Sequence, residues 1–397
     1  MGRGGESMVE AAIWLFWAAF ALTVYTYVGY PAVVGLLARM CGRPHRIGVL
    51  EPTVTLLIPA HNEAVVIAAK LDNALALDYP RDKLQIRVLS DGSTDGTDAI
   101  VRCYAANGIE LQRIEPRGGK PGAVNHGVPF ARGEILLLCD ANTLFAPDAV
   151  RRLVRHFADP AVGAVTGDVR LSSPDVAYGA GEGLFYRLER FLQISETRLW
   201  TAIGVDGGMY ALRRSLYRPN RRDTLIDDFV IAMNVAKTGA RVIYDPEAIA
   251  VEDAVPDPAQ ELRRRVRTTA GGFQSLFEGL GRPGAGQPVL WLGYLSHKVL
   301  RWLSAFVLVV MFAANAVAAQ ASPFYAALVV LHALFYAVAA AGIRLHHRAM
   351  PGIVCLPYFF CLTNAASVAG FWRWWWRAQP VTWAQADRQA SVELRSR

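Results

Sequence analysis

Two oxygen-bearing side chains after an apolar run are suited to binding a cation. The run from Ile135 to Cys139 is typical of a buried strand, and Asp140 and Asn142 come next along the chain. Because side chains alternate along a strand, we expect Asp140 and Asn142 to point the same way from its carboxyl end. One or two protein oxygens there, completed by a diphosphate, suit a hard divalent cation. The alternative is a polar turn that only closes the strand.

Three other polar loops also follow predicted strands. They are His61-Asn62-Glu63, Asp91-Gly92-Ser93 and the glycine-rich loop from Gly118 to Gly122. In a parallel sheet the carboxyl ends of the strands share one edge, so we expect all four loops to converge there. Glycines allow backbone amides to approach an anion, and Lys120 adds a positive charge. Neither a Walker loop nor a dinucleotide fingerprint is present.

The soluble part of the chain alternates between strand and helix patterns. This alternation predicts an α/β fold with a doubly wound, mostly parallel sheet and helices on both faces. Strands are expected at 54–59, 84–90, 109–114 and 134–140, and helices at 63–77, from 94 to 106, at 120–131 and from Pro147.

The composition indicates a soluble domain combined with membrane helices, because 53% of the 397 residues are hydrophobic and 19% are charged. Residues 11–37 are apolar and uncharged, which predicts a retained transmembrane helix within 1–40. We expect a cytoplasmic domain at 52–280, then an interfacial helix and transmembrane helices within 285–378, and a tail at 379–397. The interfacial helix is expected at 289–300 and the spans at 302–319, 324–341 and 353–371.

The basic residues flank apolar segments, which favours a membrane over nucleic acid as the partner of the +7 net charge. Arg39, Arg43 and Arg46 follow the first segment and predict a cytoplasmic domain. Three full spans after that domain would place the tail outside, whereas its arginines favour the inside. Either one C-terminal segment is re-entrant, or the interfacial helix is longer than expected. The amphipathic segment 184–192 either covers the sheet or lies at the membrane surface.

Together these loops and flanking spans resemble the membrane-bound family-2 glycosyltransferases, the inverting group that includes cellulose, hyaluronan and poly-N-acetylglucosamine synthases. The resemblance covers Thr53 to about Phe277. It implies a UDP-sugar donor at the carboxyl edge of the sheet. By the same resemblance Ala60 and Glu63 line the nucleoside pocket, Asp91 binds the uracil or ribose, and Lys120 lies against the nucleotide.

The resemblance also implies a metal site and a base. Asp140 and Asn142 occupy the positions of the family's metal-binding Asp-x-Asp, with Asn142 as a departure that lowers the charge offered to Mg²⁺ or Mn²⁺. Asp227 and Asp228 correspond to the last two residues of its Thr-Glu-Asp motif, and we expect Asp228 to deprotonate the acceptor hydroxyl. An acidic helix start is the alternative role for this pair.

Two further segments correspond to the acceptor and diphosphate sides of such a site. Gly207 and Gly208 lie in a segment that resembles the family's acceptor loop, with a plain turn as the alternative. Arg267 takes the Arg position of a Gln-x-x-Arg-Trp motif and is expected to neutralise the diphosphate, although an arginine run beside a membrane also suits anionic lipid. Arg264 and Thr268 replace the Gln and Trp of that motif.

The sequence therefore predicts an inner-membrane, multi-pass, metal-dependent glycosyltransferase that acts on a polysaccharide or a lipid-linked acceptor. The lost Gln and Trp favour a single transfer, and the number of C-terminal spans favours a polymer synthase. A non-catalytic membrane scaffold or export component that retains the sugar-nucleotide fold is the alternative, and only Asn142 points to it.

Overall fold

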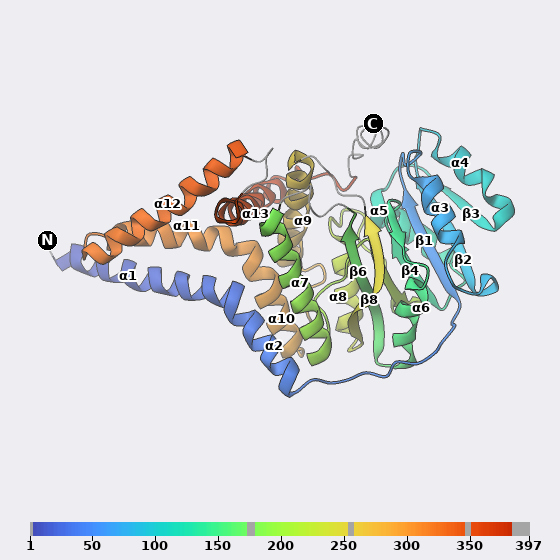
Figure 1. The fold of residues 1–397 in the computed structure, drawn as a ribbon, viewed down its shortest axis with the longest axis horizontal. Helices are drawn as coiled ribbons and strands as arrows, with labels where there is room; N and C mark the ends of the chain where they lie inside the picture. Colours follow the sequence, from blue (N-terminus) through green and yellow to red (C-terminus); the bar gives the residue numbers. More distant parts are fainter. Residues whose placement is uncertain (1–2, 173–178, 253–257, 346–350, 383–397) are drawn as a thin grey trace.

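A computed structural model describes residues 3–172, 179–252, 258–345 and 351–382. The chain forms an α/β domain and a projecting group of long apolar helices (Figure 1). The polypeptide enters the α/β domain from one of these helices and returns to the group after the domain is complete.

The first half of the sheet is parallel, as predicted. Four strands lie in the order β3-β2-β1-β4, and each neighbouring pair is parallel. Their carboxyl ends therefore share one edge, and the four polar loops leave the sheet there. The strands are β1 (Val54–Ala60), β2 (Leu84–Asp91), β3 (Ile109–Ile114) and β4 (Ile135–Cys139).

The second half of the sheet is mixed, so the prediction of a mostly parallel sheet holds only for the first half. β7 (Met209–Arg213) is antiparallel to β4 and to β6 (Val162–Leu171). β8 (Arg241–Glu252) is parallel to β6. The short β5 (Thr143–Phe145) pairs antiparallel with β8; three residues are too few to show a strand periodicity in the sequence.

Helices cover both faces of the sheet, which explains why β1 and β4 are buried along their whole length. Several predicted helices are shorter in the structure, because turns occupy residues 63–66 and a 3₁₀ segment follows Gly127. One face packs against α3 (Ile67–Leu75), α4 (Thr97–Cys103) and α6 (Ala149–Val154), and the other against α5 (Gly119–Gly127), α8 (Asp227–Lys237) and α9 (Pro258–Glu278).

Among the described residues, four helices are long and apolar enough to cross a membrane. The expected interfacial helix is continuous with the next apolar helix, since a π-helical segment joins α10 to α11 without a break. A second π-helical segment, Tyr25–Gly29, joins α1 to α2. The apolar helices are α1 (Arg3–Val24), α2 (Tyr30–Met40), α10 (Pro288–Gly293), α11 (Leu300–Ala318), α12 (Pro323–Leu345) and α13 (Gly352–Trp375).

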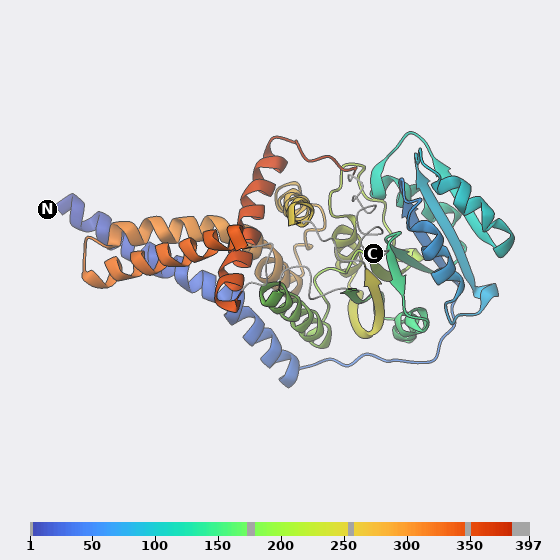
Figure 2. The ribbon, with the colours of Figure 1, turned by 45° about the horizontal axis from the view of Figure 1, so that its top comes forward.

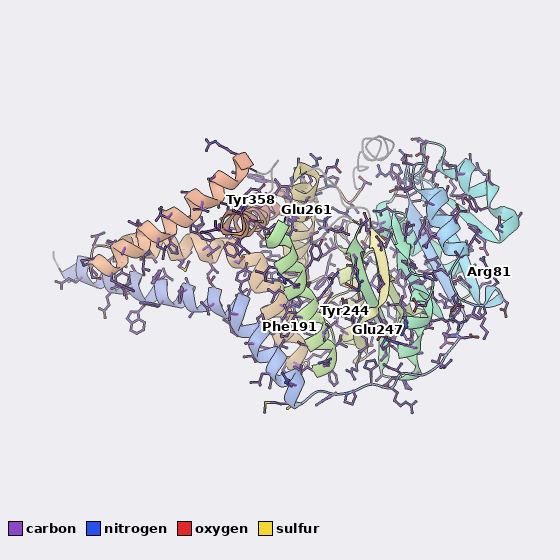
Figure 3. The ribbon with its side chains drawn as sticks, viewed as in Figure 1. Arg81, Phe191, Tyr244, Glu247, Glu261 and Tyr358 are labelled. Atoms are coloured by element: carbon purple, nitrogen blue, oxygen red, sulfur yellow. The ribbon has the colours of Figure 1, made fainter. Side chains whose placement is uncertain are left out.

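The amphipathic segment 184–192 belongs to α7 (Gly179–Leu199). This helix packs against β8 of the α/β domain and against α2. Phe191 lies on α7 toward α2 (Figure 3), and its ring occupies the space that a side chain at Gly35 would fill. The hydroxyl of Tyr30 on α2 donates a hydrogen bond to Glu196 on α7. The segment therefore packs between domain and membrane helix.

Candidate active site

Asp91 organises the glycine-rich loop. Its carboxylate oxygens accept hydrogen bonds from the backbone amides of Gly118 (2.7 Å) and Gly119 (2.8 Å), and its side chain is 1% exposed. The expectation that these two amides face a bound anion is wrong for this conformation, because the anion that they contact is Asp91 itself. A contact between Asp91 and the nucleoside remains a prediction.

The loop after β1 is tied to the loop after β2. His61 Nδ1 forms a hydrogen bond with the carbonyl oxygen of Asp91 (2.7 Å), and the Asn62 side-chain oxygen accepts one from the Thr94 amide (2.8 Å). Asn62 reaches this position with a left-handed backbone, at φ 56°. Ala60 and Glu63 lie in the same corner but are only 1% and 7% exposed, so little of either predicted nucleoside contact reaches the surface.

Lys120 bridges the predicted donor side and the predicted acceptor side. Its Nζ lies 2.5 Å from Asp140 Oδ1 and 3.2 Å from the carbonyl oxygen of Gly207. Burial alone would lower the pKa of this lysine, but the carboxylates of Asp140, Asp227 and Asp228 outweigh burial and raise its pKa. Lys120 is therefore a fixed positive charge among acids.

Asp228 has the surroundings of a general base. Its Oδ1 accepts a hydrogen bond from the Phe229 amide, and its Oδ2 lies 2.7 Å from the position that a Cβ would take at Gly207. Burial and the neighbouring Asp227 raise the pKa of Asp228 to about 6, with Lys120 opposing them. A carboxylate with that pKa is ionised at neutral pH and a stronger proton acceptor than an ordinary one.

Asp206 is a site residue that the sequence analysis did not identify. It precedes the two glycines of the predicted acceptor loop, and its Oδ1 accepts a hydrogen bond from the Gly208 amide (2.9 Å). Burial, followed by the charges of Glu252, Asp228 and Asp140, raises the pKa of Asp206 to about 7. The available signal was an acid directly before Gly-Gly, which is also an ordinary turn pattern.

Asp140 and Asn142 do not leave a strand together, because β4 ends at Cys139 and residues 140–142 form a turn. The strand alternation used to align them therefore does not apply. Asp140 contacts Lys120, whereas the side-chain nitrogen Nδ2 of Asn142 donates a hydrogen bond to Glu252 (2.8 Å).

The oxygen ligands at Asp140 suit a divalent cation that is also coordinated by a diphosphate. The Asp140 side chain is 40% exposed, and carboxylate oxygen is the ligand that Mg²⁺ and Mn²⁺ prefer. Within the described ranges, no group of three or more His, Cys, Asp or Glu side chains could hold a metal ion. A cation at this edge would thus depend on oxygens of its substrate.

Arg267 contacts the loop that carries the predicted base. From α9 it donates a hydrogen bond to the carbonyl oxygen of Leu225 (3.2 Å), two residues before Asp227. The structure therefore brings Arg267 beside the site, and its contact with a diphosphate remains a prediction.

Replacing Gly207 with alanine is expected to lower turnover by about 10-fold or more, because a 1 Å displacement of a catalytic group can cost about 10²-fold. The added methyl group would meet Asp228 Oδ2 at 2.7 Å. The measurement is kcat together with the thermal midpoint. Gly183→Ala is the control, since a methyl group there meets nothing within 4 Å. Unchanged kcat in Gly207→Ala would show that Asp228 does not need this position.

Comparison with known proteins agrees with this geometry. Residues 55–219 match Glycosyl transferase family 2, so the chain carries a family 2 glycosyl transferase domain. Its mixed, curled α/β sheet is the A-type glycosyltransferase fold. A family 2 domain and an A-type fold are what the sequence analysis expected.

Two curated relatives match a little over half of the chain. The chain is 29% identical over 231 residues to a poly-beta-1,6-N-acetyl-D-glucosamine synthase of Staphylococcus aureus, covering 56% of this chain and 55% of the synthase. It is 27% identical over 235 residues to a beta-monoglucosyldiacylglycerol synthase of Synechocystis, covering 56% and 48%. The chain thus spans about half the length of these curated relatives.

A solved structure matches most of the chain. It is a mannosyltransferase from Pyrobaculum calidifontis in complex with GDP-Man and Mn²⁺, with a TM-score of 0.72 and 28% identity. The match covers 92% of this chain and 100% of the mannosyltransferase chain. The similarity therefore extends beyond the α/β domain into the apolar helices.

Proposed function

We propose that the protein transfers a sugar from a nucleoside diphosphate-sugar to an acceptor hydroxyl, with inversion at the anomeric carbon. The observation that carries this proposal is the position of Lys120 and Asp228. Lys120 contacts Asp140 on the donor side and Gly207 on the acceptor side, and Asp228 lies against the same Gly207. The loops predicted to bind donor and acceptor thus meet at one carboxylate of raised pKa.

In the proposed mechanism, Asp228 accepts the proton of the acceptor hydroxyl as that oxygen attacks the anomeric carbon. The carbon–diphosphate bond breaks on the opposite side, so the configuration inverts. Lys120 and Arg267 supply positive charge near the departing diphosphate. A divalent cation bound at Asp140 would neutralise further negative charge on that leaving group.

For the donor we propose a UDP-sugar, as the sequence resemblance implies. GDP-mannose is a second candidate, because the mannosyltransferase that matches 92% of this chain was solved with GDP-Man. The curated relatives include a polysaccharide synthase and a glycolipid synthase, so the proposed acceptor is a polysaccharide or a lipid-linked hydroxyl at the membrane. The basic residues that follow the first apolar helix support a cytoplasmic catalytic domain in a multi-pass membrane protein.

Nucleotide release from a donor panel tests the proposal. The full chain in lipid nanodiscs with Mn²⁺ is incubated with UDP-glucose, UDP-N-acetylglucosamine and GDP-mannose, and products are analysed by mass spectrometry. We expect release of one class of nucleotide, with UDP favoured. A ladder of products would indicate repeated transfer, and one mass increment a single transfer. Nucleotide binding without turnover on any donor would support the scaffold alternative instead.

A further inference from the structure

The last apolar helix, α13, runs crosswise to the other three. α1, α11 and α12 extend together away from the α/β domain, whereas α13 is seen nearly end-on beside them in Figure 1 and turns across them in Figure 2. Contacts agree with the pictures. The Asn364 side-chain oxygen, at the middle of α13, accepts a hydrogen bond from Ser304 Oγ (2.5 Å), and Phe371 contacts Phe306 with ring centroids 5.3 Å apart. Widely spaced residues of α13 thus meet a single turn of α11.

That turn of α11 lies next to a charged cluster. Glu189 of α7 accepts hydrogen bonds from Lys298 (2.9 Å) and Arg301 (2.6 Å). Ionised groups of this kind are costly within the hydrocarbon of a bilayer, so the cluster marks the boundary between membrane and catalytic domain. Ser304 follows Arg301 by one helical turn. The middle of α13 therefore lies at this boundary, whereas the middle of a spanning helix lies at the centre of the bilayer.

α13 also packs along α9, a charged helix of the catalytic domain. Near its start, Phe359 contacts the Arg265 guanidinium (4.6 Å), and near its end the Trp374 indole nitrogen donates a hydrogen bond to Glu278 (3.0 Å). Between them a side chain at Gly370 would collide with Thr269. If α13 crossed the bilayer, it would carry part of α9 with its arginines into the hydrocarbon.

The chain after α13 returns to the catalytic domain. Val381 lies against the glycine-rich loop, where its Cγ1 is 3.1 Å from the position that a Cβ would take at Gly119. Both ends of α13 are therefore connected to the catalytic side, because α9 contacts it from Phe359 to Trp374 and Val381 comes six positions after its last residue.

The exposed side chains of α13 have the composition of a membrane-surface helix. Ile353, Leu356, Trp372 and Trp375 are all exposed, Ile353 by 80% and Trp375 by 60%. Exposed tryptophans are typical of the headgroup level of a bilayer. The basic side chain of Arg373 lies beside them on the same helix.

We propose that α13 lies flat in the headgroup region on the catalytic side of the membrane, with its exposed apolar side chains in contact with lipid, and that only α1, α11 and α12 span the bilayer. Because only α11 and α12 then cross the bilayer after the catalytic domain, the residues that follow α13 are on the side of that domain. This arrangement places the basic residues after α2 and those at the end of α13 on one side, and it resolves the conflict between span number and charge in the sequence. The expected span at 353–371 is replaced by a surface helix.

Depth measurements with paired spin labels test the proposal. Ile353 and Trp372 stand 19 positions apart, about 28 Å along a helix. In a chain with its native cysteines replaced, single cysteines at the two positions are labelled with a nitroxide in liposomes, and depth is read from oxygen and nickel-chelate accessibility. We expect both labels in the same leaflet, on the catalytic side and within about 10 Å of the headgroups.

The matched control is the pair Phe324 and Ile343 on α12, which has the same sequence separation and is also exposed. We expect these two labels near opposite surfaces of the bilayer. A depth difference for the α13 pair that equals the α12 difference would overturn the proposal.

A reporter fused after Arg397 checks topology without cysteine replacement. We expect a fusion to green fluorescent protein to be fluorescent and a fusion to alkaline phosphatase to be inactive. The reverse result would also overturn the proposal.

Discussion

Replacing Asp228 with asparagine is expected to lower kcat by about 10²–10⁴-fold while nucleotide binding is retained. Asparagine keeps the size of the side chain but cannot accept the proton of the acceptor hydroxyl. Burial raises the pKa of the Asp228 carboxyl to about 6. Ionisation of this carboxyl at neutral pH therefore lowers the free energy of unfolding. The loss grows as the pH rises from the ordinary carboxyl pKa to about 6. The variant should therefore melt no earlier than the parent. Activity is measured by nucleotide release, and binding by calorimetry.

Asp223→Asn provides the matched control for this substitution. Asp223 is an exposed acid five positions before Asp228 and pairs with Arg221, outside the proposed site. We expect unchanged kcat in that variant. If Asp228→Asn also retained full turnover with the same donor and acceptor, Asp228 would not be the base.

The pH profile gives an independent check on the same carboxylate. Since the base must be ionised, log(kcat/KM) of the parent should fall by about one for each pH unit below about 6. Asp227 contributes to the raised pKa of Asp228. In Asp227→Asn the acidic limb should therefore move to lower pH, an effect that a purely structural role of Asp227 would not produce.

The first half of the sheet and its loops were predictable because local pattern and topology agree there. β1 and β4 are apolar runs, and β2 and β3 begin with alternating apolar and polar residues. Each strand is followed by polar or glycine-rich residues, and parallel strands place those residues at one edge. The sequence therefore identified the Lys120 and Asp140 loops as neighbours. In the sheet β2 and β1 separate the two strands that carry these loops, so the direct contact at 2.5 Å depends on the path of the loop after β3 and not on strand adjacency.

The acceptor side was less predictable, because its geometry depends on strand order. β7 inserts antiparallel between β4 and β6, and this pairing brings Asp206 to Asp140 and Asp228. No local periodicity encodes which strands pair across the chain. The same reason explains why the contact of Asn142 with Glu252, which lies 110 residues later, was not predicted.

The direction of α13 was unpredictable for a different physical reason. Hydropathy and length are the same for a helix that crosses a bilayer and for one that lies on its surface against protein. The choice depends on contacts with α9, such as that between Trp374 and Glu278. The charge pattern of the sequence carried the relevant signal, since it conflicted with a fourth span.

Replacing Asp140 with asparagine is expected to weaken Mn²⁺-dependent binding of nucleotide by about 100-fold or more, because even residues that only support a metal ligand cost about 10–100-fold. The substitution removes a carboxylate that faces both the proposed cation and Lys120. The measurement is calorimetric titration of UDP or GDP with and without Mn²⁺. Binding that is equally tight in parent and variant, and equally dependent on Mn²⁺, would place the cation elsewhere.

The reciprocal substitution, Asn142→Asp, separates a metal ligand from a purely structural residue. The amide nitrogen of Asn142 donates to Glu252 at 2.8 Å, so an aspartate there sets two carboxylates against each other. If Asn142 borders the cation, the added charge should tighten Mn²⁺-dependent nucleotide binding and lower the thermal midpoint only without Mn²⁺. If Asn142 only anchors Glu252 of β8, the thermal midpoint of the variant should fall equally with and without Mn²⁺, and nucleotide binding should not tighten. The pair of variants thus tests whether the cation rests on Asp140 alone or on both positions.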